Sequence, residues 1–161
     1  MKIVNVGSEV TRDELGYETV ENYILFDNGF KLTSKHDRNC CEDVYADFQH
    51  MQVMGVRDEN YVDSNDLDFF TYVLDSIVPI DDLGFYIVTK QGICLLVSCY
   101  NVQNGYYSSD LRLEYMGKVK DISPCVPRYC QYTTEDMRAK NDAKIEHLKR
   151  GEDWRYRQEG D

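Results

Sequence analysis

The stretch HDRNCCEDV, residues 36–44, brings His36, Cys40, Cys41 and Glu42 close together in the chain. Imidazole nitrogen and thiolate sulfur are preferred zinc ligands, and a thiolate beside a base is a nucleophile. The three residues between His36 and Cys40 are a tolerable gap for a zinc site. The stretch therefore has three interpretations: a metal site, a nucleophile with its base, or a buried structural corner.

The metal interpretation gains little from the other cysteines. Cys94 and Cys99, like Cys125 and Cys130, are separated by four residues, at the loose end of zinc-site spacing. In a straight strand Cys94 and Cys99 face opposite sides, because their separation is odd. Free cysteine in a reducing compartment commonly behaves as a small buried hydrophobe. We therefore expect buried thiols, and neither a metal nor a cofactor.

The catalytic interpretation lacks a supporting motif. The only histidines are His36, His50 and His147, and their nearness to cysteine in sequence does not establish nearness in space. The sequence has no C-x₅-R phosphate loop, G-x-S-x-G elbow, H-E-x-x-H pair or glycine-rich nucleotide loop. No pair of carboxylates has a spacing that marks it for acid–base work. The sequence predicts no catalytic residue and a protein that is not an enzyme.

The elements around the stretch read as β-structure. A short strand is expected at 2–6, and YILF-DNG-FKLTS predicts a hairpin of strands 22–27 and 30–35. Asn28-Gly29 suits a type I′ turn, which needs positive φ at both central residues. The opening stretch therefore begins where this hairpin ends. Its continuation, 44–48, alternates poorly and fits either a strand or one helical turn.

Further apolar segments extend this pattern. Residues 69–78 are apolar and β-branched and end at Pro79. A second hairpin is expected from 85–90 and 93–100, with a turn at Gln91-Gly92. Residues 111–116 alternate between apolar and polar side chains, which is typical of a strand with one buried face. Together these segments predict an antiparallel meander.

The end of the chain predicts a helix. Thr133 or Thr134 is a suitable N-cap, Gly151 is a suitable residue to follow the last turn, and the helix would run to about residue 150. Its apolar stripe is thin, so we expect a peripheral helix. The stripe comprises Met137, Ile145 and Leu148. The predicted fold class is α+β in a single domain: residues 1–132 form a sheet-rich region of five to seven antiparallel strands, and 133–161 form a helix and tail packed on or extending from it.

Negative charge is concentrated in the middle of the chain. The net charge is −11, and residues 37–82 hold twelve acids against Arg38 and Arg57, a sum of −10. Such a surface repels phosphate backbones and favours basic partners. A solvated, solubilising face is the simpler alternative. The partner-binding interpretation predicts an acidic face that includes Asp43, Asp47, Asp58, Glu59, Asp63, Asp66 and Asp68.

The composition is that of a globular protein, with 42% hydrophobic and 29% charged residues. No apolar run approaches the roughly 20 residues of a membrane helix. The first residues lack the apolar region of a signal peptide. We therefore expect a cytoplasmic protein without membrane contact.

Two motifs together resemble an uncharacterised family of small domains from bacteriophages, prophages and gut-bacterial mobile elements. The first is H-x-x-x-C-C-E-x-V at 36–44, and the second is Asn-Gly-Tyr-Tyr-Ser at 104–108, followed by a strand from Leu111. Asn39 departs from the family, which usually has Asp there. The resemblance covers roughly residues 20–116 and implies origin and fold rather than chemistry. It favours a structural corner of His36, Cys40, Cys41 and Glu42, with Tyr106 and Tyr107 packed nearby.

These observations favour a non-enzymatic binding protein, encoded by a phage or mobile element. It would act in the cytoplasm of a bacterial host cell, where its acidic face engages a basic host protein. A nucleic-acid-binding defence or replication factor is an example, whereas direct binding to a nucleic-acid backbone is disfavoured by charge. A small-ligand or nucleotide-binding domain that uses an aromatic sheet is the alternative. A zinc- or cysteine-dependent enzyme is a third possibility.

Overall fold

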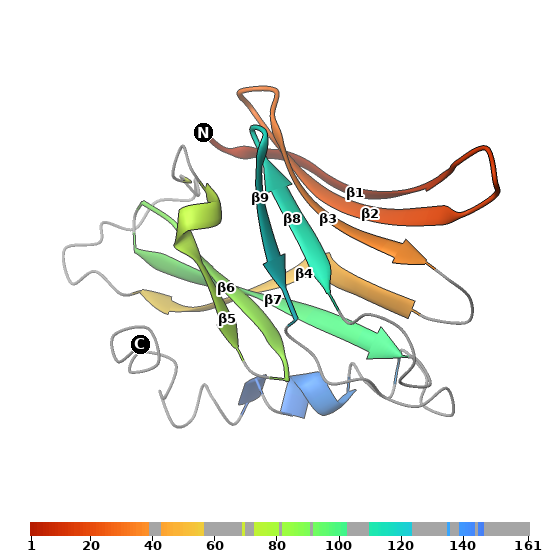
Figure 1. Ribbon diagram of the computed structural model, residues 1–161. Helices are drawn as coiled ribbons and strands as arrows, with labels where there is room; N and C mark the ends of the chain where they lie inside the picture. The colour runs from red at the N-terminus through yellow and green to blue at the C-terminus, as the bar shows by residue number, and fades with distance from the viewer. Residues whose placement is uncertain are drawn as a thin grey trace.

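The computed structural model (Figure 1) describes residues 1–38, 43–56, 69, 73–80, 82–90, 92–102, 110–123, 135, 139–143 and 145–146, with backbone alone at 43, 55, 56 and 102. Its strands are β1 (Ile3–Arg12), β2 (Glu18–Phe26), β3 (Lys31–Arg38), β4 (Asp43–Val56), β5 (Ile77–Ile80), β6 (Gly84–Val88), β7 (Ile93–Val102), β8 (Leu111–Tyr115) and β9 (Lys118–Ile122). A 3₁₀ helix, η1 (Val73–Ser76), precedes β5. Residues 139–143 and 145–146 are α-helical.

The strands form two antiparallel sheets that face each other (Figure 1). The first sheet has the order β1-β2-β3-β8-β9, and the second sheet has the order β4-β7-β6-β5. The chain enters the second sheet at β4 and returns at β8, which pairs with β3. The prediction of one meander with five to seven strands is therefore wrong, because the described residues already contain nine strands in two sheets. The fold is mainly antiparallel sheet with one small helix near the C-terminus, rather than a clear α+β domain.

In the first sheet, apolar side chains alternate along the strands, so that they point into the core between the two sheets. In β8, Leu111, Leu113 and Tyr115 are buried while the residues between them are partly exposed, as the sequence predicted. In β2, Ile24 and Phe26 face the same core. The second sheet contributes, among others, Phe48, Phe85, Ile87, Leu95 and Val97. The inner faces of both sheets thus bury one continuous apolar cluster, which holds the sheets together.

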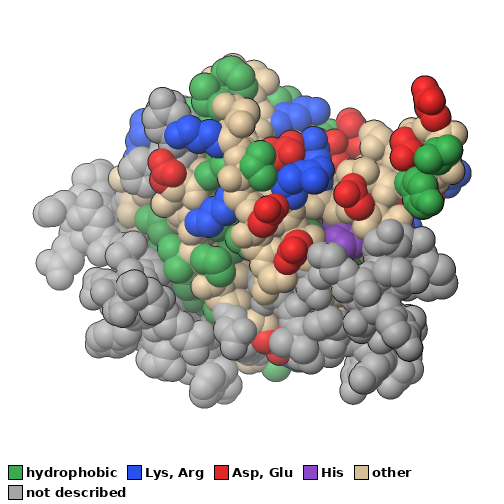
Figure 2. Space-filling view, viewed as in Figure 1, with side chains coloured by type: hydrophobic (Ala, Val, Ile, Leu, Met, Phe, Trp, Pro, Cys, Tyr) green, Lys and Arg blue, Asp and Glu red, His purple; other side chains and the backbone are tan. Residues whose placement is uncertain are grey.

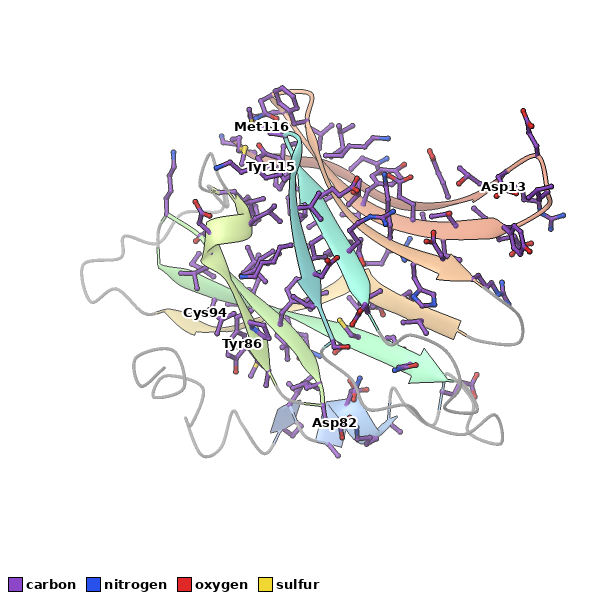
Figure 3. The ribbon with its side chains drawn as sticks, viewed as in Figure 1. Asp13, Asp82, Tyr86, Cys94, Tyr115 and Met116 are labelled. Carbon is purple, nitrogen blue, oxygen red and sulfur yellow. The ribbon has the colours of Figure 1, made fainter. Side chains whose placement is uncertain are left out.

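The second sheet is also covered on its other face. Met54, Ile80, Tyr86, Cys94 and Leu96 form a second buried cluster there, and Ile145 from the helical segment packs against it. Figure 3 shows Tyr86 and Cys94 close together on this side of the sheet. Burial on both faces explains why β6 and β7 read as continuous apolar runs rather than alternating ones.

The helical segment is anchored more firmly than its thin apolar stripe predicted. Asn141 is fully buried, and its Nδ2 donates a hydrogen bond to the backbone oxygen of Cys99 (3.1 Å). Lys140 Nζ lies 2.9 Å from Oδ2 of Asp82, beyond the end of β5. Ile145 is 1% exposed. The prediction of a peripheral helix missed these anchors, because two of the three are polar and do not register in an apolar stripe.

The predicted hairpin of β2 and β3 is confirmed, but the prediction of a type I′ turn is wrong. Of the two predicted residues only Gly29 has positive φ (87°), so the turn is not type I′. The amide of Gly29 donates to the oxygen of Phe26, and the amide of Phe26 donates to the oxygen of Phe30, which closes a three-residue loop. The two-residue loop with positive φ at both positions lies elsewhere, at Met116 and Gly117 (50° and 79°) between β8 and β9.

Pro79 does not end its apolar segment. The described part of that segment comprises Phe69, η1 and the start of β5. Pro79 lies within β5, opposite Phe85 of β6. β5 is an edge strand of the second sheet. Edge strands tolerate proline, which has no amide hydrogen to donate to a neighbouring strand. The described part of the chain contains no helix that is long and apolar enough to cross a bilayer.

Candidate functional site: a groove between two edge strands

His36, the first residue of the opening stretch, is buried in β3. Its side chain is 5% exposed, and its Nδ1 lies 3.0 Å from the backbone oxygen of Asp110. Because a carbonyl only accepts, Nδ1 carries the proton and ties the end of β3 to the start of β8. Cys40, Cys41, Glu42, Tyr106 and Tyr107 lie outside the described residues, so the predicted corner stays a prediction.

One predicted member of the acidic face is not on an open face. The side chain of Asp47 is only 7% exposed. The backbone of Asp43 is described, as the first residue of β4. The other five predicted residues of the acidic face lie outside the described part of the chain: Asp58, Glu59, Asp63, Asp66 and Asp68.

Asp47 is buried because β4 bulges directly after it. Asp47 pairs with Ser98 of β7, and Gln52 pairs with Leu96, so residues 48–51 lie opposite Val97 alone. β4 is an edge strand, so the extra residues displace the chain without breaking a second ladder. Such bulges re-aim side chains and are frequent beside functional sites.

The bulge is stabilised by the Asp47 carboxylate. His50 Nδ1 lies 2.9 Å from Oδ2 and 3.1 Å from Oδ1 of Asp47, and the amide of Gln49 donates to Oδ1 (3.2 Å). Because a carboxylate only accepts, Nδ1 donates the hydrogen bond to Asp47. The second ring nitrogen, Nε2, lies on the other side of the ring. The His50 side chain is 63% exposed. The result is a buried carboxylate with an oriented imidazole at its mouth.

A groove of about 210 Å³ runs past this pair. It is lined by residues 6–8 of β1, Asn22 of β2 and residues 45–50 of β4. β1 and β4 are edge strands of the two different sheets, so the groove lies where the two sheets meet along their edges. Its volume is below the roughly 300 Å³ at which drug-sized ligand pockets begin. It therefore suits one side chain or a small fragment.

The cysteines of the second sheet are not part of this groove. Cys94 lies in the cluster beneath the helical segment and Cys99 in the core between the sheets, as the odd separation predicted. Both are buried free thiols. Within the described ranges, no group of three or more His, Cys, Asp or Glu side chains is placed to hold a metal ion. Cys125 and Cys130 lie outside those ranges.

No family model matches the chain, and no curated protein or solved structure matches it in sequence or fold. The resemblance to the phage and mobile-element family therefore stays a prediction. The groove must be interpreted from its own residues.

The pairing of Asp47 with His50 was not predicted. The available signal was the poor alternation of residues 44–48, which left strand and helical turn equally open. Interrupted alternation at an edge strand is what a bulge produces. The i,i+3 spacing of Asp47 and His50 in such a bulge then brings the two side chains together.

Proposed function

We propose that this protein is a non-enzymatic binding protein that engages a basic protein partner through negative charge, with the groove between β1 and β4 as the centre of recognition. The observation that carries the proposal is the Asp47 carboxylate, held at 7% exposure in a groove the size of one side chain. A lysine or arginine side chain of the partner fits this chemistry, because a carboxylate pairs with either through charge-assisted hydrogen bonds.

The pair with His50 leaves the carboxylate able to bind a cation. A carboxylate has about four lone-pair sites, so its contacts with His50 and Gln49 are compatible with a further contact to an incoming cation. Apart from His50, the surrounding strand adds no basic side chain, since β4 contains Asp43 and Asp47 but neither lysine nor arginine. The groove is thus an acidic site on an acidic segment.

The charge of the wider segment would guide the partner to the groove. Residues 37–82 sum to −10, and β4 lies within them. Fields of this kind raise association rates and weaken steeply with salt. The proposal includes the family's origin: a phage or mobile element encodes the protein, and it meets its basic partner in the cytoplasm of the bacterial host cell.

The proposal is tested by capture from bacterial lysate with three forms of the protein: wild type, Asp47→Asn and Asp75→Asn. Asp75 is an exposed acid of η1 in the same charged segment, so its variant is matched in charge. We expect wild type to capture a basic protein that is released by salt. Asp47→Asn should weaken binding at least about tenfold, and Asp75→Asn less than about twofold.

Equal retention by the Asp47 and Asp75 variants would contradict the role of the groove. Binding that resists salt would contradict the electrostatic mechanism altogether. Asparagine retains the shape of Asp47 and can still accept from Gln49 and His50, so a change in melting temperature controls for local unfolding.

The aromatic rings of the core offer no platform for the alternative function, ligand binding by an aromatic sheet. Phe26 packs against Phe69 and Tyr115, and Phe48 packs against Phe85, all inside the core. These core rings are not available to stack on a ligand, and the negative charge around the groove favours a basic partner over a nucleotide.

A further inference from the structure

The outer face of the first sheet carries side chains of both charges, with lysines gathered in one hollow. A hollow of about 310 Å³ lies there, lined by Lys31, Thr33 and Lys35 of β3, Glu114 of β8 and residues 115–119. We call this the outer hollow. Figure 2 shows lysine and arginine side chains on this face, with acidic side chains between them. In a chain of net charge −11, three lysines in the lining of one hollow are a local departure from the overall charge.

We propose that the outer hollow is a binding site for a small phosphate-bearing anion. Three lysines line it, namely Lys31, Lys35 and Lys118, against one carboxylate, Glu114, which leaves a local charge of +2. This site is separate from the acidic groove, and it does not depend on the function proposed for that groove.

Glu114 does not cancel the lysines. Its carboxylate is shared between Lys35 Nζ at 2.8 Å and Arg112 Nε at 3.0 Å. The hydrogen bond from Lys35, together with the nearby charges of Lys35 and Arg112, lowers the pKa of Glu114 against the opposing effect of burial. Glu114 is therefore already neutralised by two cations and also holds Lys35 in place at the wall of the outer hollow.

Lys31 is held ready by an aromatic ring. Its Nζ lies 4.3 Å from the centroid of the Tyr23 ring, and among the described residues it makes no ion pair. A cation over an aromatic face stays positioned without having its charge cancelled. Lys31 can therefore give its full charge to an incoming anion.

Thr33 supplies a donor at the floor of the outer hollow. It lies between Lys31 and Lys35 on the same face of β3, because side chains two apart share a face. The residue is 7% exposed, and its Oγ1 has no hydrogen-bond partner among the described residues. Buried hydroxyls are normally paired, so an unpaired one in the lining of a cationic hollow points to a missing acceptor. A phosphate oxygen fits, because it accepts from both the hydroxyl and the lysines.

The neighbouring residues limit the size of the ligand. In the register row of Lys35, Glu21 lies beside Lys35 and Asp121 beside Arg112, both outside the lining of the outer hollow. The tip of the β8–β9 hairpin, where Figure 3 labels Tyr115 and Met116, closes the opposite end. Acidic residues on one side and a turn on the other favour a compact anion over a long nucleic-acid backbone.

The test is a titration of the full chain with pyrophosphate, followed by amide chemical shifts at constant ionic strength. We expect saturable shifts in residues 31–35 and 114–119. Lys31→Gln should weaken binding about three- to fivefold, in line with the loss of one exposed charge pair. The matched control is Lys90→Gln in the β6–β7 turn of the second sheet, which should leave the affinity unchanged.

Thr33→Val separates a ligand-binding hydroxyl from a structural one. Valine keeps the shape and removes the unpaired oxygen, so we expect no loss of thermal stability but about threefold weaker pyrophosphate binding. Citrate serves as a polyanion without phosphate and should bind more weakly than pyrophosphate. Shifts that do not saturate, equal affinities of the Lys31 and Lys90 variants, or citrate binding as tight as pyrophosphate would overturn the assignment.

Discussion

The two sheets differ in how many of their faces are covered. The second sheet is buried between the core and the cluster around Ile145, whereas the first sheet is buried on one face and open on the other. The open face of the first sheet bears the outer hollow, and the groove lies along the edges that both sheets share. The second sheet thus acts mainly as a scaffold. The proposed binding surfaces are the outer face of the first sheet and the groove between β1 and the bulged strand β4.

The largest difference between the two sheets is expected when one methyl group is added to a glycine in each. A Cβ at Gly84 in β6 would overlap the backbone oxygen of Val97, which cannot move without breaking the sheet. A Cβ at Gly7 in β1 would meet the Tyr23 hydroxyl at 2.5 Å, and that side chain can move. We expect Gly84→Ala to lower the free energy of unfolding by about 3 kcal/mol or more, and Gly7→Ala by less than about 1 kcal/mol.

Chemical denaturation of both glycine variants measures this difference. A Gly84 variant as stable as wild type would show that the second sheet is not tightly packed at this position, and the contrast between the sheets would fail.

The cover on the second sheet is tested by a matched pair of truncations. Ile145→Ala removes a side chain that is 1% exposed against Tyr86 and Leu96, and should cost about 2–4 kcal/mol of unfolding free energy. Val119→Ala, at 55% exposure on the open side of the first sheet, should cost less than about 0.5 kcal/mol. Equal losses in urea titrations would mean that the helical segment does not cover the second sheet.

The polar anchor of the helical segment should have a smaller effect. Asn141→Ala leaves the backbone oxygen of Cys99 without its side-chain donor, at a cost of about 1–2 kcal/mol. Hydrogen exchange provides the readout, since amides of residues 139–146 should lose protection more than those of β8. Uniform loss of protection across both regions would contradict a local anchoring role.

Glu114 gives the smallest effect, and it depends on pH. Its pKa is lowered in the folded protein, so its stabilisation is present above the ordinary value of 4.5 and is lost as the pH falls through the folded pKa. At neutral pH, Glu114→Gln should reduce the unfolding free energy by less than about 1 kcal/mol, because the pair is partly solvated. Denaturation at neutral and at strongly acidic pH should show the difference between variant and wild type shrinking in acid. A difference that grows in acid would contradict the assignment.

The sequence predicted those elements whose signals are local. The β2–β3 and β6–β7 hairpins and the buried face of β8 follow from turn residues and alternation over a few positions. β9 was not predicted, because KVKDI buries only Ile122 and so lacks an apolar pattern. β1 was expected only at 2–6, because its second half is an exposed edge with polar residues.

The arrangement of these elements depends on contacts distant in sequence. The pairing of β3 with β8 joins residues almost eighty positions apart, which no local pattern encodes. The groove depends on β1 and β4 being edges of different sheets, which follows only from the complete topology. The charge excess of residues 37–82 was visible from the start, but the burial of Asp47 required knowledge of the bulge.

The most direct test of the proposed function is a titration of the protein with a lysine- and arginine-rich peptide from the captured partner, followed by amide chemical shifts at two salt concentrations. We expect the largest shifts in residues 6–8 and 45–50, and we expect binding to weaken steeply with salt and with Asp47→Asn. Shifts centred elsewhere in the described residues, with an affinity that Asp47→Asn leaves unchanged, would contradict the proposed function.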